Sequence, residues 1–460
     1  MNKGGRNIYL VYLLPMAAAH GPLMHGILAV SASHLSNRTP PGHTPQEEGL
    51  IDHQYTLHAL AIRGIRQDLA DQDGSVIKDH TVAMNLFAIL YTISEGQTNG
   101  EYHQHLAAAK TMLGLLKSEN AEFCDFIYEN ITYYATLSTL LSTKDQKYLL
   151  IPHPSGMSQT PNIQRIGVFC SLFSIFSRIN HLRHRIRQHI DNSNNGTVSV
   201  DPTVYAEAAG IDIDLRQWTP APSFPESSDQ WFAAQFCQRA TWLYLRRTMI
   251  FPTAGPTTVA TRVATYSITP PPEIDTVLVD AFDLFENLDH QDTSNCCLLY
   301  PVFLLGCCSF EPKYRKRTLN ALNRLGQYSG LGNVEQTKKV LEHGVWRVMD
   351  GKSDIILSSS NQTDRNASSS SVVVEGKGKG RANGKITRYD YDDNNDHDND
   401  GHDDDINKEG GEDEEKADEE EEEEEDNDES SLISIHRNKR VSSWDCERIA
   451  EEMGMDFLIT

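Results

Sequence analysis

One stretch of the sequence has the spacing of a calcium-binding loop. The segment Asp396–Gly401, DHDNDG, carries an aspartate at every second position before a glycine, like the first half of an EF-hand loop. The twelfth position of such a loop requires a bidentate glutamate, but here it is Asn407, and no helical pattern flanks the segment. We therefore expect no calcium site there.

A second group alternates histidines and arginines near the end of a long helical pattern. Its members are His181, Arg183, His184, Arg185, Arg187 and His189. A metal site on one helix face needs histidines four residues apart beside a carboxylate, and the guanidinium groups would repel a cation. Arginines without interleaved aromatic residues are also a weak sign of nucleic-acid binding. We predict an ordinary solvated basic surface at this helix end.

A third group is aromatic. The segment Gln230–Met249 is predicted to be one long helix, and four aromatic side chains contribute to its large apolar face: Trp231, Phe232, Phe236 and Trp242. Such a face suits either the wall of a small-molecule pocket or plain hydrophobic core. Core is the more common role, so we favour it and keep the pocket as the alternative.

Common catalytic motifs are missing from the sequence. The patterns of serine hydrolases (G-x-S-x-G), zinc proteases (H-E-x-x-H) and phosphate-binding loops (G-x-x-x-x-G-K-[ST]) do not occur, nor does a dinucleotide fingerprint after a strand. We predict that the chain is not an enzyme and that it has no catalytic residues, metal site or organic cofactor of its own.

The elements that position these side chains are all predicted to be helices. The stretch Pro22–Leu35 is apolar nearly all round, with small residues between larger ones, so we expect a buried central helix. No sustained alternation of apolar and polar residues indicates a strand. We predict an all-α fold, a large irregular multi-helix domain. Further helical patterns run over residues 46–69, 79–95, 102–116, 123–141, 163–190, 275–288 and 296–308.

Negative charge is concentrated in one segment. The 460 residues carry a formal net charge of −24, but Asp390–Glu429 alone hold 25 aspartates and glutamates against Lys408 and Lys416. The other 420 residues are left with a net charge of −1, so the overall acidity says nothing about their partners. Because few bulky apolar residues are interleaved with the acidic ones, we favour a solvating spacer over an activation segment or a binder of basic proteins.

Composition divides the chain into three parts. Residues 1–351 hold the helical patterns, whereas residues 352–442 contain serine runs, a Gly/Lys segment and the acidic block. The second part cannot bury enough apolar surface to offset its chain entropy, so we expect it to be disordered. Residues 443–460 regain an apolar residue at every fourth position, which predicts a C-terminal helix docked on the helical domain. The low-complexity part is then an insertion before the last helix.

Cysteines and apolar runs bear on the location of the chain. None of the eight cysteines forms a C-x-x-C pair, and most stand among apolar neighbours, which predicts buried free thiols in a reducing compartment. The apolar run Ile8–Leu14 is short and Pro15 follows it, so we do not expect a secretory signal. We also predict no membrane association, because the apolar stretch at Pro22–Leu35 is too short to span a bilayer.

The end of the helical region has a recognisable order of motifs. PVFLLGCCSF, residues 301–310, is followed at residues 315–351 by RKRTLNALNRLGQYSGLGNVEQTKKVLEHGVWRVMDG. This order resembles the closing part of the fungal-specific transcription factor domain, the large C-terminal region of zinc-cluster regulators. In that family an apolar P-x-F-x-x-G helix precedes an Arg-bearing helix, a Gly-rich turn and a helix that ends in Val-Trp and Asp. The matching residues are Pro301, Phe303, Gly306, Arg317, Gly330, Gly332, Asn333, Val345, Trp346 and Asp350.

Other segments resemble the same family. The N-terminal LLPMAAAHGPLMHGILAVSASHL is similar to its opening, residues 100–116 to its middle helix and residues 444–460 to its last helix. Within the Gly-rich turn, we expect the Asn333 side chain to cap the next helix and Gly332 to allow a left-handed turn before it.

The resemblance implies a transcription regulator in the nucleus, with the cytoplasm as the alternative location. Such a domain would act through partner proteins of the transcription machinery, through a homodimer or through a small-molecule effector. Zinc-cluster regulators bind two zinc ions with six N-terminal cysteines and place a helix in the DNA major groove. This chain has no cysteine before Cys124. We therefore expect zinc only if an upstream cluster exists, and DNA contact only indirectly or through a missing N-terminal domain.

Two alternatives stay open. The first alternative to a regulator is a helical module that senses a sterol-like or lipid-like molecule, with the aromatic helix as a pocket wall. The second is a truncated remnant without DNA-binding activity of its own. The basic groups Lys313–Arg317 and Arg437–Arg440 are weak nuclear-import candidates.

Overall fold

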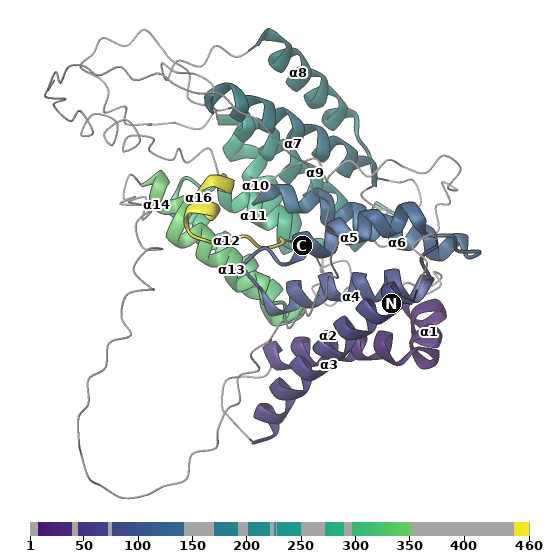
Figure 1. Ribbon diagram of the computed structural model, residues 1–460. Helices are drawn as coiled ribbons and strands as arrows, with labels where there is room; N and C mark the ends of the chain where they lie inside the picture. The colour runs from purple at the N-terminus through teal and green to yellow at the C-terminus, as the bar shows by residue number, and fades with distance from the viewer. Residues whose placement is uncertain are drawn as a thin grey trace, which may run out of the picture. The chain divides into compact units, whose positions relative to one another are not determined.

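The regular structure of the chain is helical. The computed structural model describes residues 8–38, 45–71, 76–141, 170–191, 201–220, 225–226, 228–249, 272–288, 297–350 and 446–459. Within these ranges the regular elements are helices (Figure 1), which confirms the all-α prediction. Two isolated β-bridges pair Ile77 with Leu116 and Asn99 with Asp456. Two compact units divide the chain, Met1–Ile356 with Arg440–Thr460 and Leu357–Lys439, and the described residues belong to the first. The predicted disordered insertion and the DHDNDG segment lie outside them.

The N-terminal helices pack around α4. These elements are η1 (Tyr9–Leu13), α1 (Leu14–Ala19), α2 (Gly21–Arg38), α3 (Pro45–Ala70), α4 (Asp79–Glu95), α5 (Tyr102–Leu115) and α6 (Ala121–Leu137), followed by the single turn η2 (Ser138–Leu140). Helix α4 contacts α2, α3, α5 and α6. Its side chains are buried on nearly every side, as the long apolar run in its sequence requires.

The prediction that Pro22–Leu35 forms a helix buried all round is wrong on one side. Helix α2 buries the face that carries small residues such as Ala29 and Ala32, and this face packs against α3 and α4. On the other side, Leu28 is 44% and Leu35 56% exposed. The small residues let neighbouring helices approach closely, and Leu23 is buried with them, but Leu28 and Leu35 point to solvent.

The middle helices are arranged around α9. They are α7 (Cys170–Asp191), α8 (Pro202–Gln217), α9 (Asp229–Thr248) and α10 (Pro272–Glu286). Helix α9 contacts α7, α8, α10 and the later helix α11. Side chains cap two of these helices, since Asp201 accepts a hydrogen bond from the backbone N–H of Thr203 and Ser228 accepts one from that of Trp231.

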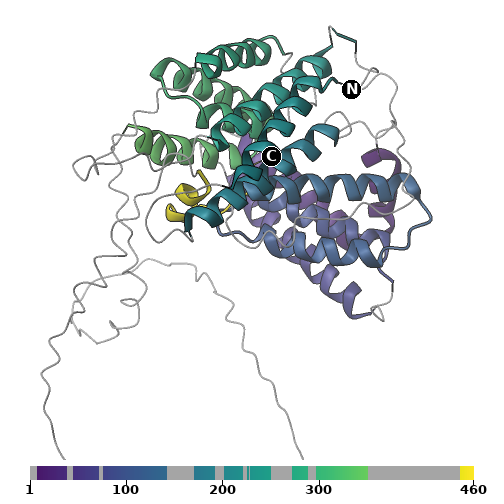
Figure 2. The ribbon, with the colours of Figure 1, turned by 90° about the horizontal axis from the view of Figure 1, so that it is seen from above.

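The closing helices complete a single core. They are α11 (Leu299–Cys307), α12 (Pro312–Ser329), α13 (Asn333–Lys339), η6 (Val340–Val345), α14 (Trp346–Met349) and α16 (Cys446–Glu452). The elements α13, η6 and α14 are continuous along the chain, with the π-helical turn η6 between two α-helical parts. Figures 1 and 2 show α16, in yellow, beside these green helices, and it contacts η6. One hydrophobic cluster extends from Leu13 to Ile459.

The C-terminal helix is shorter than its sequence pattern suggests. Helix α16 ends at Glu452, and Gly454 has a left-handed φ of 67°. The residues after this turn leave the helix but remain buried: Met455, Phe457, Leu458 and Ile459. The apolar repeat at every fourth residue therefore reflects burial by two different backbone conformations.

The contact between α2 and α3 depends on a glycine. A Cβ atom at Gly64 of α3 would overlap the ring of Pro22 in α2. By contrast, a Cβ atom at Gly210 within α8 would meet nothing within 4 Å.

We expect Gly64→Ala to lower the free energy of unfolding by about 1–3 kcal/mol, because the added methyl group overpacks the helix contact. Gly210→Ala is the matched control and should raise that free energy by about 0.5–1 kcal/mol through helix propensity alone. Urea unfolding of the two variants measures both effects. Equal changes in the two variants would contradict the close contact between α2 and α3.

A stacked histidine joins α3 to α4. The ring of His58 stacks on that of Tyr91 with centroids 3.9 Å apart and an interplanar angle of 12°. Burial, with a smaller contribution from His105, lowers the pKa of His58 from 6.5 to about 4. The folded chain therefore holds this imidazole neutral at pH values where the unfolded chain protonates it.

Stability contributed by His58 should be complete above pH 6.5 and should be lost as the pH falls from 6.5 through about 4. We expect the free energy of unfolding of His58→Gln to fall less steeply over this interval than that of the unchanged chain. His53→Gln, at an exposed position on the same helix, is the control for replacing a histidine of α3 by glutamine. Denaturant unfolding at a series of pH values gives the three slopes.

Candidate functional site

Residues of the family motif at 301–351, here called the closing motif, meet where α11 packs on η6 and α14. A Cβ atom at Gly306 would lie 2.5 Å from a methyl carbon of Leu341, so the glycine allows η6 to approach α11. The indole Nε1 of Trp346 donates to the carbonyl oxygen of Gly306 at 2.9 Å. Pro301 and Phe303 are buried in α11. Gly306 and Trp346, 40 positions apart in the sequence, are therefore in direct contact through a hydrogen bond.

The Gly-rich turn differs from the prediction in two ways. Gly330, not Gly332, has the left-handed backbone, with a φ of 59° after α12, whereas the φ of Gly332 is −63°. Gly332 is required for a close approach instead, because its Cβ atom would lie 2.7 Å from the backbone of Ser94 and Glu95. Its N–H donates to the Ser94 carbonyl at 2.8 Å. The turn thus packs backbone against backbone at the end of α4.

The predicted capping role of Asn333 is also wrong. Asn333 is the first residue of α13, and no side-chain hydrogen bond caps this helix. Its Nδ2 instead donates to the carbonyl oxygen of Leu458 at 2.9 Å, and the residue is fully buried. The asparagine therefore attaches the C-terminal segment to the start of α13.

Two arginines of α12 form ion pairs with different neighbouring elements. Arg315 donates to both carboxylate oxygens of Asp350 at 2.8 and 3.0 Å. Arg317, which the resemblance matches to the family's Arg-bearing helix, instead contacts Asp283 and Glu286 of α10. The two residues Arg315 and Arg317 thus tie α12 to the end of α14 and to α10.

The C-terminal segment is held at the loop between α4 and α5. Asp456 pairs through its backbone with Thr98 and Gly100, at 2.8 and 2.9 Å. Its carboxylate accepts a hydrogen bond from the Tyr102 hydroxyl at 2.8 Å and lies 3.1 Å from Nε2 of His103. Burial and this neighbouring carboxylate raise the pKa of Tyr102 far above its usual range, so the hydroxyl remains a donor. Asp456 therefore supplies hydrogen-bond partners to the α4–α5 loop and to the first turn of α5.

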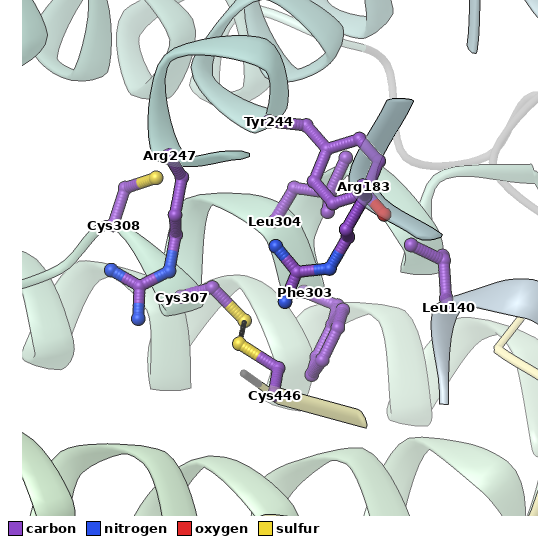
Figure 3. A pocket seen from close by; sticks show the side chains of 9 residues that line it. All are labelled: Leu140, Arg183, Tyr244, Arg247, Phe303, Leu304, Cys307, Cys308 and Cys446. Carbon is purple, nitrogen blue, oxygen red and sulfur yellow. Dashed lines mark hydrogen bonds between the residues drawn. The ribbon is translucent and has the colours of Figure 1, made fainter. Parts of the chain in front are cut away.

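A small pocket lies where α7, α9, α11 and α16 meet (Figure 3). Its described lining residues are Leu140, Arg183, Tyr244, Arg247, Phe303, Leu304, Cys307, Cys308 and Cys446. Sγ of Cys446 lies 3.2 Å from Sγ of Cys307, and the Arg183 guanidinium lies 5.7 Å from the centroid of the Tyr244 ring. The space open to the centre of a water molecule is about 10 Å³, which is room for roughly one water.

Two thiols of this pocket, those of Cys307 and Cys308, are poorly reactive. Burial raises the pKa of Cys307 well above its ordinary value and that of Cys308 to about 12, although the nearby Arg247 guanidinium acts in the opposite direction. Both thiols therefore stay protonated at neutral pH, and a protonated thiol is a poor nucleophile. The arrangement supplies packing and positive charge rather than a reactive group.

The prediction of a solvated basic end of α7 is wrong for two of its arginines. Arg183 is 3% and Arg187 9% exposed, and Arg185 forms an ion pair with Glu207 of α8. Arg183 and Arg187 follow the buried Ile179 by four and eight positions, which places them on the apolar stripe of the helix. The sequence holds this signal. Burial of Arg183 and Arg187 was not predicted because charged side chains are rarely buried in a core.

The three histidines of α7 do not converge on a carboxylate among the described residues. His181 and His189 are exposed, whereas His184 is half-buried and its pKa is lowered by burial and by nearby Arg187 and His181. No metal cluster in the described ranges includes them.

The four aromatic residues considered as a pocket wall do not line this pocket. Trp231 and Phe232 are half-buried and pack edge to face, and Phe236 is fully buried against Phe285 of α10. Trp242 donates its indole N–H to Asp212 of α8 at 2.8 Å. Helix α9 contributes Tyr244 and Arg247 to the pocket instead.

Comparison with known families adds to this geometry. Residues 2–459 match the model of the fungal specific transcription factor domain. The chain belongs to this family. The match confirms the resemblance seen in the closing motif and covers nearly all of the chain. No curated protein and no solved structure matches the transcription factor domain of this chain. None of the domain's described helices is both long enough and apolar enough to cross a bilayer.

The bond between Tyr102 and Asp456 provides a test of how the domain closes. Asp456→Ala should lower the free energy of unfolding by about 1–3 kcal/mol, because the buried Tyr102 hydroxyl loses its acceptor. In a Tyr102→Phe background the same substitution should cost less. The double variant should then be more stable than the sum of the single effects predicts. Urea unfolding of the four proteins measures this coupling, and strictly additive effects would contradict a direct bond.

Proposed function

We propose that this domain regulates transcription in the nucleus through contacts with other proteins, either components of the transcription machinery or a second copy of the chain. The family match over residues 2–459 supports the role in transcription. The mode of action is argued from the surface of the described helices, in particular from its arginines and its exposed apolar side chains.

The arginines of the helices are poorly placed to bind DNA. Binding to phosphates requires cationic side chains that are available on one face. Five of the described arginines are instead paired with carboxylates of neighbouring elements: Arg178 with Asp214, Arg185 with Glu207, Arg239 with Asp280, Arg315 with Asp350 and Arg317 with Asp283. The net charge of −1 outside Asp390–Glu429 agrees with this. DNA contact would therefore be indirect or would depend on another domain.

Exposed apolar side chains on the N-terminal helices carry the proposal of a protein partner. Leu28 and Leu35 lie seven positions apart on the solvent side of α2, and Leu10, Val11 and Leu14 are exposed on η1 and α1. Large apolar side chains exposed on elements that contact one another are typical of protein interaction sites, and α1 contacts α2. A partner that covers them gains hydrophobic burial without any change in the core.

The sensing of a lipid-like molecule receives little support from the described residues. The pocket beside Cys307 has room for roughly one water, and two guanidinium groups line it. A sterol needs a far larger apolar cavity. The third alternative, a non-functional remnant, is decided by the experiment below.

The basic group Lys313–Arg317 is a poor nuclear-import signal in this fold. It lies on α12, where Arg315 and Arg317 are paired with carboxylates and Lys313 pairs with Glu311. The group Arg437–Arg440 lies outside the described residues and remains the import candidate of the proposal.

The proposal is tested with the full chain joined to a heterologous DNA-binding domain in a fungal host that carries a reporter gene. We expect the fusion to change reporter output relative to the DNA-binding domain alone. The variant Leu28→Lys/Leu35→Lys should lose this change, since loss of a buried apolar anchor weakens a partner contact by about tenfold or more.

Ile213→Lys is the matched control, because Ile213 is 54% exposed on α8, a different part of the surface. This variant should keep the reporter response. Analytical ultracentrifugation of the same proteins separates a second copy from a different partner. A fusion without any effect on the reporter would overturn the proposal and favour the remnant.

A further inference from the structure

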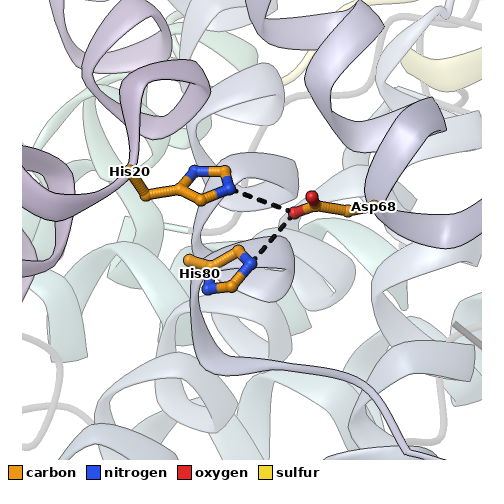
Figure 4. Close-up of side chains that lie close together, drawn as sticks. All are labelled: His20, Asp68 and His80. Atoms are coloured by element: carbon orange, nitrogen blue, oxygen red, sulfur yellow. Dashed lines mark ion pairs between the residues drawn. The ribbon is translucent and has the colours of Figure 1, made fainter. Parts of the chain in front are cut away.

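We propose that His20, Asp68 and His80 form a binding site for a divalent transition-metal ion such as Zn²⁺. Three parts of the fold bring these residues together (Figure 4). His20 joins α1 to α2, Asp68 lies in the last turn of α3, and His80 lies in the first turn of α4. This site is separate from the closing motif, and its metal binding does not depend on the proposed function.

The ligand atoms already lie at separations close to those around a metal. Nε2 of His80 is 3.1 Å and Nε2 of His20 is 3.5 Å from the same oxygen, Oδ2 of Asp68. All three atoms lie within 4.8 Å of one another. Zinc binds histidine nitrogen and carboxylate oxygen at about 2.0–2.2 Å, and in tetrahedral geometry such ligands are roughly 3.2–3.6 Å apart. The Asp68 distances therefore need little adjustment.

The two imidazole rings face the carboxylate together. They stack with centroids 4.0 Å apart and an interplanar angle of 23°, so both Nε2 atoms point toward Asp68 in Figure 4. A further tilt of the rings would direct the two nitrogen lone pairs to a common point. The side chains are 16–22% exposed, so an ion can reach them from solvent and water can complete its coordination.

The environment of His80 suits metal binding. Burial and the neighbouring His20 lower the pKa of His80, with Lys78 acting in the same direction and Asp68 opposing. The neutral imidazole, which is the form that binds a metal, is thereby favoured at neutral pH. A carboxylate ligand offsets part of the charge of a divalent cation, which an imidazole ligand does not.

Neighbouring groups orient the ligands. The Thr81 hydroxyl donates to Oδ2 of Asp68 at 3.1 Å, which fixes the carboxylate. The backbone N–H of Leu23 reaches Nδ1 of His20 at 3.4 Å but also donates to the His20 carbonyl at 3.1 Å. Because that N–H keeps the carbonyl as an acceptor, Nδ1 can take up the ring proton when Nε2 binds the ion. The cost of changing tautomer is then one long hydrogen bond.

An ion at this position would join α3 and α4 to the link between α1 and α2. Without a metal, the contacts of both histidines with Asp68 already link these elements. A metal replaces these contacts with stronger bonds and raises the stability of the folded state by mass action. It would also fix the start of α2, the helix that exposes Leu28 and Leu35.

The test uses the full chain, purified and freed of metals by a chelator. Zn²⁺ is titrated by calorimetry, Co²⁺ by its visible absorption band, and the melting temperature is recorded with and without Zn²⁺. The chain has 18 histidines and a long acidic segment, so weak background binding is expected and only the comparison of variants decides. His80→Gln, His20→Gln and Asp68→Asn each remove one ligand.

His103→Gln is the matched control, since His103 also contacts a carboxylate, that of Asp456, but has no second histidine partner there. We expect one Zn²⁺ per chain with an affinity at least tenfold weaker in each ligand variant and unaltered in the control. The Co²⁺ band and the Zn²⁺-dependent rise in melting temperature should disappear with the same three substitutions.

Equal titrations of the unchanged chain and the ligand variants would mean adventitious binding only and would overturn the proposal. So would the absence of any Zn²⁺ binding, which would leave the triad as a set of polar contacts between helices. If His80→Gln reduced the helical circular dichroism signal, His20→Gln and Asp68→Asn would decide by the same criteria.

Discussion

The C-terminal segment supplies partners for polar groups that are buried elsewhere in the fold. Tyr102 donates to the Asp456 carboxylate, and Asn333 donates to the Leu458 carbonyl. Both donors are almost fully inaccessible to water, so without the segment each would lose a hydrogen bond that water could replace only if the core opened. Closure of the N-terminal and closing helices therefore depends on residues after Glu452, although these residues form no helix.

Backbone proximity at glycines is the second constraint on this fold. Gly64 lies against Pro22, Gly306 against Leu341, and Gly332 against the last turn of α4. At each position a side chain would force two elements apart. An irregular bundle has no repeating spacing between its helices, so single residues set how closely each pair packs. This explains why glycines of the closing motif contact neighbouring elements directly.

The sequence allowed the helices to be predicted but not their partners. Apolar periodicity is local, so most helices of the body were located to within a few residues, whereas α8 (Pro202–Gln217) was not predicted. Whether Leu28 faces core or solvent depends on which helices cover α2, and no local pattern contains that information. The asparagine in GLGN looked like a cap because the rule is local, whereas its real partner is 125 positions away. The pocket arginines and the triad at Asp68 also combine elements that only the tertiary fold brings together.

The order of synthesis gives the bond between Tyr102 and Asp456 a kinetic meaning. The two residues are 354 positions apart, and contacts of such long sequence separation form slowly and late. At about 5–20 residues per second, a ribosome needs about 5–20 s to make residues 351–445 alone. During this interval the nascent helical body has its apolar groups near η6 and the α4–α5 loop uncovered. The chain therefore reaches its native core only after residues 446–459 have been made, and its exposure to chaperones and to aggregation is set by the length of that interval.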